Sequence, residues 1–450
     1  MTFHAYNTLH RRKEPLEPIV PGKVGFYVCG PTVYDLIHLG NARPLVVFDV
    51  LFRLLRLEFG EGNVKYVRNI TDIEDKINAA AKERSIAIAE LTVTTTERFH
   101  QDAAALGCLE PSVEPRATGH IPEMIALIER LIERSHAYEA DGHVLFDVPS
   151  YEPYGRLSGN SRDEIVAGAR IDVAPYKKDA ADFVLWKPSV DDQPGWESPW
   201  GFGRPGWHLE CSAMSHKHLG ADFDIHGGGR DLIFPHHENE VAQTCAADPD
   251  GGFARIWMHN GYLSVDGEKM SKSLGNFYTV RDLLEEWPGE ALRFALLSAQ
   301  YRQPLDFTFD ALKQAKASLD RFYNALGQAK DPQPGEVPQP VLDALNDDLN
   351  TPLAISTMHT IADAVFKGEA GAGAALRGAG SVLGLIQGYS KDWFQSGDDD
   401  ETDEIEGLIA ERIAARKDKD FARADQIRDD LKARGIELMD GPEGTSWKRV

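Results

Sequence analysis

The sequence predicts an α/β protein built on a parallel sheet and followed by further domains. The stretch VGFYVCGPTVYD, from Val24, is an apolar and β-branched run that predicts a buried strand ending at Gly30-Pro31. Residues 43–60 place apolar side chains at helical spacing, and residues 64–75 begin as a second strand. A strand, a helix and a strand at this spacing indicate a βαβ unit with parallel strands. At 450 residues, the chain is long enough for roughly two to four domains.

The later elements follow from the same kinds of pattern. A long helical stretch is expected over roughly 73–106, and an amphipathic helix over 117–138. Residues 150–205 are rich in proline, glycine and tryptophan, which predicts an inserted, loop-rich subdomain. The other short elements expected in this half are strands at 143–148, 221–229 and 256–265 and a helix at 234–247.

Two linkers are expected in the C-terminal part of the chain. DPQPGEVPQP, at 331–340, is typical of a proline-rich linker, and a helical segment follows it to about residue 390. SGDDDETDEIEG, at 396–407, predicts an acidic and solvated connector. The last forty residues or so are therefore expected to form a separate small unit.

Composition excludes several classes of protein. We find no apolar run of membrane length, and the polar N-terminal stretch MTFHAYNTLHRRKEPLEP has no signal-peptide core. The four cysteines are scattered, which is typical of cytosolic thiols rather than of a disulfide framework. A net charge of -23 argues against indiscriminate nucleic-acid binding but leaves room for a local basic patch. We expect a cytoplasmic protein with no membrane segment.

The stretch FPHHENE, at 234–240, gathers two histidines and two carboxylates. In a helix after Pro235, His236 and Glu240 lie four residues apart on one face, while His237 points about 100° away. Zinc takes Cys, His and carboxylate ligands, so Cys29 and Cys211 are candidate partners at the mouth of the sheet. Spacing alone leaves the alternative open, in which the histidines cap or pack and the cysteines are small buried apolar side chains.

Two further stretches suit a polyphosphate. His38, Gly40 and Asn41 lie where a loop enters a helix, and the positive end of a helix favours phosphate. Residues 268–273, EKMSKS, place two lysines and two serines between glycines, as in a flexible loop that closes on pyrophosphate. A solvated basic turn is the alternative for EKMSKS alone, but it does not explain both stretches in this order.

Together these stretches resemble class I aminoacyl-tRNA synthetases. HLGN at 38–41 and KMSKS at 269–273 are similar to the two ATP-binding signatures of that class. CGPTVYD, VRNITDIEDK, GWHLECSAM, HGGGRDLIFPHHENE and GPEGTSWKR resemble the cysteinyl-tRNA synthetase family, from Cys29 to the end of the chain. The first signature is typically His-x-Gly-His, and Asn41 replaces its second histidine here. Asparagine donates a hydrogen bond to phosphate but carries no charge.

The resemblance implies an amino-acid pocket with one zinc per chain. In the family, residues matching Cys29, Cys211, His236 and Glu240 hold the ion, and the substrate L-cysteine binds it through sulfur. Positions matching Thr71 and Trp207 line the same pocket, although ordinary strand and core packing is an equal alternative for both.

The resemblance also implies how ATP is used. Lys269, Lys272, His38 and Asn41 are the expected catalytic residues, with Mg²⁺ on the phosphates and Lys272 in the most direct contact with ATP. The remaining positions expected to hold the nucleotide are Gly40, His226, Gly228 and Asp231.

The domain order implied by the resemblance places tRNA recognition at the C-terminus. Residues 411–450 contain ten Lys or Arg against nine Asp or Glu, and Trp447 beside Lys448 and Arg449 is typical of base stacking next to phosphate-binding cations. A buried Trp in a small helical cap is the alternative. The implied partner is tRNA(Cys), and the family implies a monomer. The implied domains are a Rossmann-type parallel-sheet catalytic domain at 1–275 with an insertion at about 119–200, a stem-contact region at 276–325, a helical bundle at 326–395 and an anticodon-binding domain at 405–450.

Two rival functions share parts of this pattern. The cysteine ligase of the mycothiol pathway also makes cysteinyl-adenylate but acts on an amino sugar, and it lacks the anticodon domain that GPEGTSWKR indicates here. A non-catalytic zinc and nucleotide binder is the other rival, and the intact KMSKS argues against it.

Overall fold

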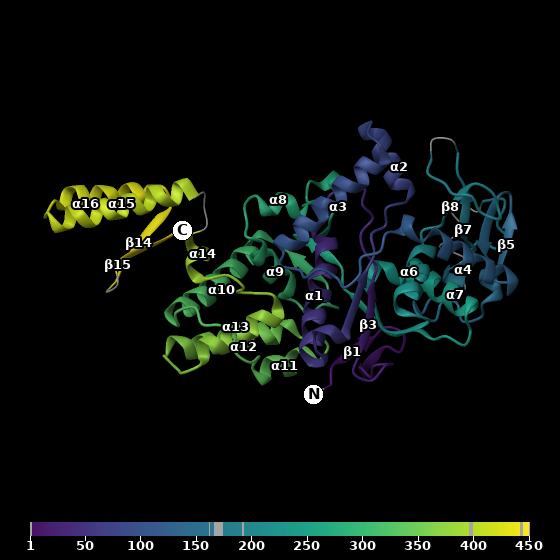
Figure 1. Cartoon of the computed structure of the whole chain (residues 1–450), viewed down its shortest axis with the longest axis horizontal. Helices are drawn as coiled ribbons and strands as arrows, with labels where there is room; N and C mark the ends of the chain where they lie inside the picture. Colours follow the sequence, from purple (N-terminus) through teal and green to yellow (C-terminus); the bar gives the residue numbers. More distant parts are fainter. Residues whose placement is uncertain are drawn as a thin grey trace. The chain divides into compact units, whose positions relative to one another are not determined.

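The structure is a computed structural model of the chain (Figure 1). It describes residues 2–161, 163–165, 174–190, 193–395, 399–441 and 444–449, and only the backbone of residues 272, 399–403, 439, 441, 444, 446, 448 and 449. The chain forms two compact units. The first contains residues 1–315, 339–356 and 382–385, and the second contains residues 316–338, 357–381 and 386–450. No helix among the described residues combines the length and apolar character that crossing a membrane requires.

The predicted parallel sheet is the centre of the first unit. Its strand order is β10-β9-β3-β4, and every neighbouring pair is parallel. Helix α1 (Leu39–Phe59) connects β3 to β4, so the predicted βαβ unit is confirmed. The four strands are β3 (Val24–Val28), β4 (Val64–Arg68), β9 (Asp222–Gly229) and β10 (Phe253–Asn260).

Alternation along β3 shows which helices cover the sheet. Phe26 stacks on Tyr66 at 4.4 Å between ring centroids and also meets Phe52 of α1 at 6.0 Å. Tyr27, its neighbour in the strand, instead belongs to the core cluster that contains Leu209 and Met214 of α6 (Leu209–Leu219). Because successive strand residues point to opposite faces, α1 covers one face of the sheet and α6 covers the other.

The insertion between β4 and β9 contains a second sheet. Its antiparallel order is β5-β6-β7-β8, and α4 (Ile121–Glu133) precedes it. Residues 150–205 were expected to be loop-rich, yet they supply two of these strands, because Phe183, Leu185 and Trp186 are buried apolar side chains that a sheet can cover. The four strands are β5 (Ala137–Ala140), β6 (His143–Phe146), β7 (Phe183–Pro188) and β8 (Gly203–Pro205).

Three smaller sheets complete the strand inventory of the described residues. The hairpin β1–β2 opens the chain and β14–β15 closes it, and both are antiparallel. In the third, β11 pairs antiparallel with β12 and parallel with β13. Their bounds are β1 (His4–Asn7), β2 (Arg12–Pro15), β11 (Leu263–Val265), β12 (Glu268–Lys269), β13 (Leu305–Phe307), β14 (Ile436–Gly441) and β15 (Gly444–Arg449).

The helices differ from the sequence prediction at one clear place. The long helix expected over 73–106 is two helices, because Ser85 adopts a left-handed conformation with φ 54° and ends the first one. The helices not yet named are α2 (Asp75–Arg84), α3 (Ile88–Ala105), α7 (Glu238–Ala247), α8 (Val280–Leu284), α9 (Gly289–Leu297), α10 (Phe309–Gln328), α11 (Gln339–Asn346), α12 (Thr351–Phe366), α13 (Ala372–Leu383), α14 (Ser390–Gln395), α15 (Asp399–Lys417) and α16 (Phe421–Ala433). Single turns lie at Glu61–Asn63, Ala117–His120, Val148–Ser150, Arg230–Leu232, Ile233–His237 and Lys272–Leu274.

The acidic stretch at 396–407 is not a connector throughout. Residues 396–398 lie outside the described part of the chain, but α15 begins at Asp399, so the remaining acidic residues form the first turns of a helix. Acidic residues are favoured there because the N-terminus of a helix carries a partial positive charge. Helices α15 and α16 and the hairpin β14–β15 enclose a small core made of Ile405, Ile409, Ile427, Leu431, Ile436 and Trp447.

Candidate metal and nucleotide site

Four potential metal ligands from separate parts of the chain meet at the carboxyl end of the parallel sheet. Cys29 follows β3, Cys211 lies on α6, and Glu240 lies on α7, one turn after His236. Cys29 Sγ is 3.4 Å from Cys211 Sγ and 3.5 Å from both His236 Nε2 and Glu240 Oε1. His236 Nε2 and Glu240 Oε1 are 3.0 Å apart, as expected for two side chains on one helical face. One donor atom of each residue lies within 4.8 Å of all the others, which suits a single ion.

A second set of four donors shares two members with the first. It replaces Cys211 and His236 by His226 and His237, and its donor atoms also lie within 4.8 Å of one another. His237 therefore approaches the cluster despite its different direction on the helix, with Nε2 3.3 Å from Cys29 Sγ. Its other nitrogen is 2.8 Å from His259 Nε2. Geometry alone allows a metal in either set.

Burial and mutual contact set the charges in this cluster. Burial raises the pKa of the Cys29 thiol, whereas its hydrogen bond to Cys211 lowers the pKa of the Cys211 thiol to about 6. Burial by itself raises the pKa of Glu240, but the neighbouring His226 and His236 bring it well below its ordinary value. The cluster therefore combines a ready thiolate with a carboxylate, and both are charged donors that a divalent cation prefers.

Of the two predicted pocket residues, Trp207 contacts the cluster directly and Thr71 is linked to it through Asn69, which lies 3.8 Å from Cys211 Sγ. Trp207 is 42 % exposed and stacks on His236, with 4.5 Å between ring centroids and 23° between planes. Thr71 is buried and donates a hydrogen bond of 3.0 Å to Glu210 Oε2, while Asn69 Nδ2 donates to Thr71 Oγ1 at 3.1 Å. Both residues therefore lie near the candidate metal ligands, and their contact with the substrate stays a prediction.

The first signature begins α1, as predicted. His38 is the N-cap: its Nδ1 accepts a hydrogen bond of 3.0 Å from the Gly40 N–H, and the His38 N–H donates to Asn41 Oδ1 at 3.3 Å. Asn41 therefore helps to cap the helix. A Cβ on Gly40 would lie 2.8 Å from the His38 ring and 3.5 Å from Met270 Cε, so the two signatures are in close contact at this glycine.

The glycine run at the end of β9 has no room for side chains. His226, which precedes this run, does not lie where the sequence predicted. A Cβ on Gly228 would lie 2.8 Å from the His237 ring, and Asp231 follows in an exposed turn. His226 was expected to hold the nucleotide, yet it is 0 % exposed and its Nε2 lies 2.8 Å from Glu240 Oε2. Because the strand turns this side chain inward, His226 supports the metal ligand rather than lining a nucleotide cleft.

The second signature forms a loop closed by polar contacts. Asn276 Oδ1 accepts from the Ser271 N–H at 2.8 Å, and Asn276 Nδ2 donates to the Lys269 carbonyl at 3.3 Å. Lys269 is exposed at the end of β12. Lys272 lies in a single helical turn, and its side chain falls outside the part of the chain that the structure describes. The loop lies beside the N-terminus of α1 through Met270.

Similarity to known proteins agrees with this arrangement. Residues 15–317 match the family model for the catalytic domain of class I (C) tRNA synthetases, residues 340–387 match the DALR domain, and residues 398–447 match the cysteinyl-tRNA ligase anticodon binding domain. The cysteine–tRNA ligase of Paramagnetospirillum magneticum is 59 % identical over 461 residues, covering 100 % of both chains. That of Acidiphilium cryptum is 59 % identical over 446 residues, covering 99 % of both.

The chain belongs to the cysteine–tRNA ligase family. Solved structures with lower identity support the fold. Methionyl-tRNA synthetase of Mycobacterium tuberculosis, in complex with methionyl-adenylate, has a TM-score of 0.53 at 17 % identity and covers 80 % of this chain and 89 % of its own. A LeuRS of Agrobacterium radiobacter K84, in a ternary complex with tRNA and LeuAMS, has a TM-score of 0.57 at 11 % identity over 84 % and 85 % of the two chains. The class I synthetase fold predicted from the sequence is confirmed.

Within this member of the family, the C-terminal tryptophan is part of a core. Trp447 is 3 % exposed and packs with Ile409, Ile427 and Leu431. A side chain buried there offers no exposed face on which a base could stack, so the structure favours the buried-Trp alternative. The backbones of Lys448 and Arg449 pair with Glu437 and Ile436, and their side chains lie outside the described atoms.

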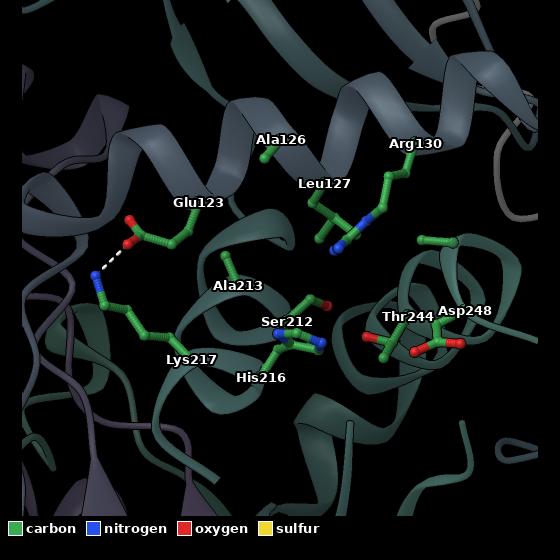
Figure 2. A pocket seen from close by; sticks show the side chains of 11 residues that line it. Glu123, Ala126, Leu127, Arg130, Ser212, Ala213, His216, Lys217, Thr244 and Asp248 are labelled. Carbon is green, nitrogen blue, oxygen red and sulfur yellow. Dashed lines mark hydrogen bonds and ion pairs between the residues drawn. The ribbon is translucent and has the colours of Figure 1, made fainter. Parts of the chain in front are cut away.

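A separate pocket lies between α4, α6 and α7 (Figure 2) and has a volume of about 260 Å³. Lys217 and Glu123 form an ion pair at one side of it, and Arg130 extends from α4 on the other. Ser212 and Thr244 also line it, and both lie on the helices that carry Cys211 and Glu240. This family member therefore has a small cavity behind its candidate metal ligands, which no sequence motif indicated.

Proposed function

We propose that the chain joins L-cysteine to tRNA(Cys) in two steps, through a cysteinyl-adenylate made from ATP, and that it acts as a cytoplasmic monomer. The observation that carries this proposal is the placement of two sites at one end of the parallel sheet. A cluster of thiol, imidazole and carboxylate donors lies at the same end of the sheet as the paired phosphate signatures around Gly40 and Met270. Family membership supports the same activity.

Zinc fits the set Cys29, Cys211, His236 and Glu240, because these are the donor types that zinc prefers. When bound, the ion supplies a soft Lewis-acidic centre that prefers a thiolate to the alcohol of serine. Cavity shape alone separates such close analogues by only about 1–3 kcal/mol. The lowered pKa of Cys211 favours this set over the one with His226, since His226 already bonds to the second oxygen of Glu240.

The protein's own residues hold this donor set in place. His226 binds Glu240 Oε2, which leaves Oε1 directed at Cys29 and His236. His208 Nδ1 lies 3.0 Å from His236 Nδ1 and restrains the outer edge of that ring. Trp207 covers the ring from its exposed side and is the residue proposed to close over the substrate. Such supporting contacts fix ligand orientation and tune affinity.

Adenylation requires positioning and charge stabilisation rather than a general base. The α-carboxylate of cysteine is ionised at neutral pH, so it attacks the α-phosphate directly. A carboxylate–phosphorus bond forms, the bond between the α- and β-phosphates breaks, and pyrophosphate leaves with its charge. The N-terminus of α1 at His38, Gly40 and Asn41, the lysines Lys269 and Lys272, and Mg²⁺ on the phosphates are proposed to stabilise that charge.

The second step transfers cysteine to the tRNA. A ribose hydroxyl of the terminal adenosine attacks the acyl carbon of the adenylate, and AMP leaves. Anticodon recognition is assigned to the C-terminal unit, where residues 398–447 match the anticodon binding model. That match also argues against the amino-sugar ligase, which lacks such a domain.

Two assays test the proposal. Cysteine-dependent exchange of pyrophosphate into ATP should be strong with cysteine and close to background with serine. Purified protein should also attach cysteine to tRNA(Cys) and leave an amino-sugar acceptor unchanged. Exchange without tRNA charging would contradict the ligase assignment, and no exchange with any amino acid would leave only a binding protein.

A further inference from the structure

Arg43 is a fully buried cation in the second turn of α1, just after the first signature. Its exposed fraction is 0 %, and its guanidinium donates only to main-chain carbonyl groups among the described residues. Nη1 donates to Gly261 at 2.8 Å and to Tyr262 at 2.9 Å. Nη2 donates to Gln303 at 2.7 Å and to Gln300 at 3.4 Å. One side chain therefore joins α1 to two other segments.

Arg43 has no carboxylate partner among the residues that the structure describes. Burial lowers its pKa to about 10, so it remains a cation at neutral pH. Arg293 provides the contrast: it is equally buried, on α9, but forms an ion pair with Asp49 of α1. Burying a charge without a counter-ion costs free energy, which hydrogen bonds to the charged group must offset. The four carbonyl groups provide those hydrogen bonds for Arg43.

The segments that Arg43 holds form the root of the signature loop. Gly261 and Tyr262 lead from β10 into β11, and β11 pairs with β12, which runs into KMSKS. Residues 300–303 lead into β13, which pairs with β11 on its other side. A Cβ on Gly261 would lie 2.6 Å from the Arg302 carbonyl, so the segment before β11 and the segment before β13 are in direct backbone contact. Arg43 thus bonds to both segments that lead into the three-stranded sheet preceding the loop.

The far end of the loop is fixed to the same helix by main-chain bonds. The Leu39 N–H donates to Tyr278 at 3.3 Å, and the Val280 N–H donates to Ile37 at 2.9 Å. The His38 ring also lies 5.2 Å from the Phe277 ring. Both ends of the loop are thus held near the start of α1. At the root, the link to α1 is made by the Arg43 side chain, while Gln300, Tyr301 and Arg302 also bond to Asp348.

We propose that Arg43 is a positioning residue for adenylation, which fixes the root of the Glu268–Ser273 loop to the helix that carries His38, Gly40 and Asn41. This inference rests on the proposed adenylation activity. Without the fork of hydrogen bonds, the sheet root shifts, and the loop lysines no longer meet the phosphates at the distance that the transition state needs. The hydrogen bonds of Arg43 go to Gly261, Tyr262, Gln300 and Gln303 and to none of the candidate metal ligands, so cysteine binding should change far less than adenylation.

The test compares Arg43→Met and Arg43→Lys with the matched control Arg293→Lys. The control removes an equally buried guanidinium group that pairs with Asp49 of the same helix, α1. In pyrophosphate exchange, Arg43→Met should lower kcat about 100-fold and Arg43→Lys about tenfold, as expected for a small misplacement of reacting groups. The KM for cysteine and the bound metal should stay within about twofold. Arg293→Lys should lower the thermal midpoint by a similar amount but leave kcat within about twofold.

Trypsin cleavage after Lys269, measured without ATP, supplies a second readout that needs no activity. It should be several-fold faster in both Arg43 variants and unchanged in Arg293→Lys. If Arg43→Met does not fold, Arg43→Lys carries the test alone. Wild-type kcat and cleavage in Arg43→Lys would overturn the proposal, as would an equal decrease of kcat in the Arg43 and Arg293 variants. Absence of pyrophosphate exchange in the wild type would contradict the proposed function. The cleavage comparison would still test whether Arg43 fixes the root of the loop.

Discussion

Cys211, His236 and Glu240 are at most 3 % exposed and come from two helices that pack on the sheet, whereas Lys269 of the signature loop is exposed and reaches Asn276 only through its backbone. The metal-ligand cluster is held by further side chains, such as His226 and His208. The loop is held at its two roots. Selection between a thiol and an alcohol requires donors that do not move, whereas phosphate chemistry requires a segment that closes on its substrate.

The largest expected effect comes from breaking the rigid site. His236→Ala should abolish metal retention and lower cysteine-dependent exchange by a factor of about 100 or more, because outer contacts alone are worth about 10–100-fold in metal affinity. His237→Ala should keep the metal, since only the second donor set needs that ring. Elemental analysis and equilibrium binding of cysteine measure both. Metal loss in the His237 variant with retention in the His236 variant would reverse the ligand assignment.

The next effect comes from the signature loop. Lys272→Ala should lower the exchange rate about 10²–10³-fold, the usual decrease when one group that stabilises developing charge is removed. Metal content and cysteine affinity should remain close to wild type, because the loop lysine acts on the phosphates in the transition state. Lys313→Ala, at an exposed lysine of α10, is a suitable control. An unchanged exchange rate would show that the loop does not serve adenylation.

Removing the C-terminal unit should separate the two half-reactions. Deletion of residues 399–450, which begins where α15 begins, should leave exchange within a few-fold of the full chain. The KM for tRNA should rise roughly 5- to 150-fold for each stacked base that the truncated chain no longer binds, with a further salt-dependent share from the phosphates. Charging kinetics at two salt concentrations measure this. A truncated chain that charges tRNA normally would leave the unit with a structural role only.

Trp447→Ala should act on the small core of the C-terminal unit. Truncating a buried tryptophan typically lowers the free energy of unfolding by about 3–5 kcal/mol, and the side chain is 3 % exposed here. Chemical unfolding followed by circular dichroism measures the decrease. A variant that keeps its stability but binds tRNA more weakly would instead support the prediction from sequence that Trp447 stacks on a base.

The smallest effect comes from the surface of that unit. Arg412 binds Asp440 through two hydrogen bonds of 2.9 Å and, with Thr445, holds the pKa of Asp440 well below its ordinary value. Asp440→Asn should lower the free energy of unfolding by about 0.2–1 kcal/mol at neutral pH, because solvent screens the exposed carboxylate of Asp440, although Arg412 is buried. A lowered folded-state pKa stabilises above the ordinary value of about 4, and that stability is lost as the pH falls. The free energies of unfolding of the variant and the wild type should therefore become equal at acidic pH.

Helical periodicity correctly placed His236 beside Glu240 without knowledge of the rest of the fold. Metal binding by this donor set stays a prediction. Cys29 and Cys211 followed from motifs at the ends of predicted elements. The role of His226 did not follow, because its bond to Glu240 depends on how β9 sits against α7. Which histidines of a cluster bind a metal and which support a ligand is decided by packing between elements.

The errors elsewhere have similar physical causes. Trp447 lies beside two cations in sequence, but alternate residues of a strand face opposite sides, and no local pattern tells which side is the core. The break at Ser85 is a left-handed residue inside a helical pattern. Arg43 gave no sequence signal, because a charged residue among apolar neighbours on a helix is usually assigned to a solvated face.

The strand order of the parallel sheet also sets the order of events during synthesis. β3 and β4 are made early, but β9 pairs directly with β3, and Asp224 accepts from the Gly25 N–H although the two residues are 199 positions apart in sequence. A growing chain must therefore hold β3 without its neighbour β9 while the whole insertion emerges from the ribosome. Contacts of such long sequence separation form slowly. The candidate donor set is incomplete until Glu240 has emerged, so a metal bound by this set would load only after more than half of the protein has been translated.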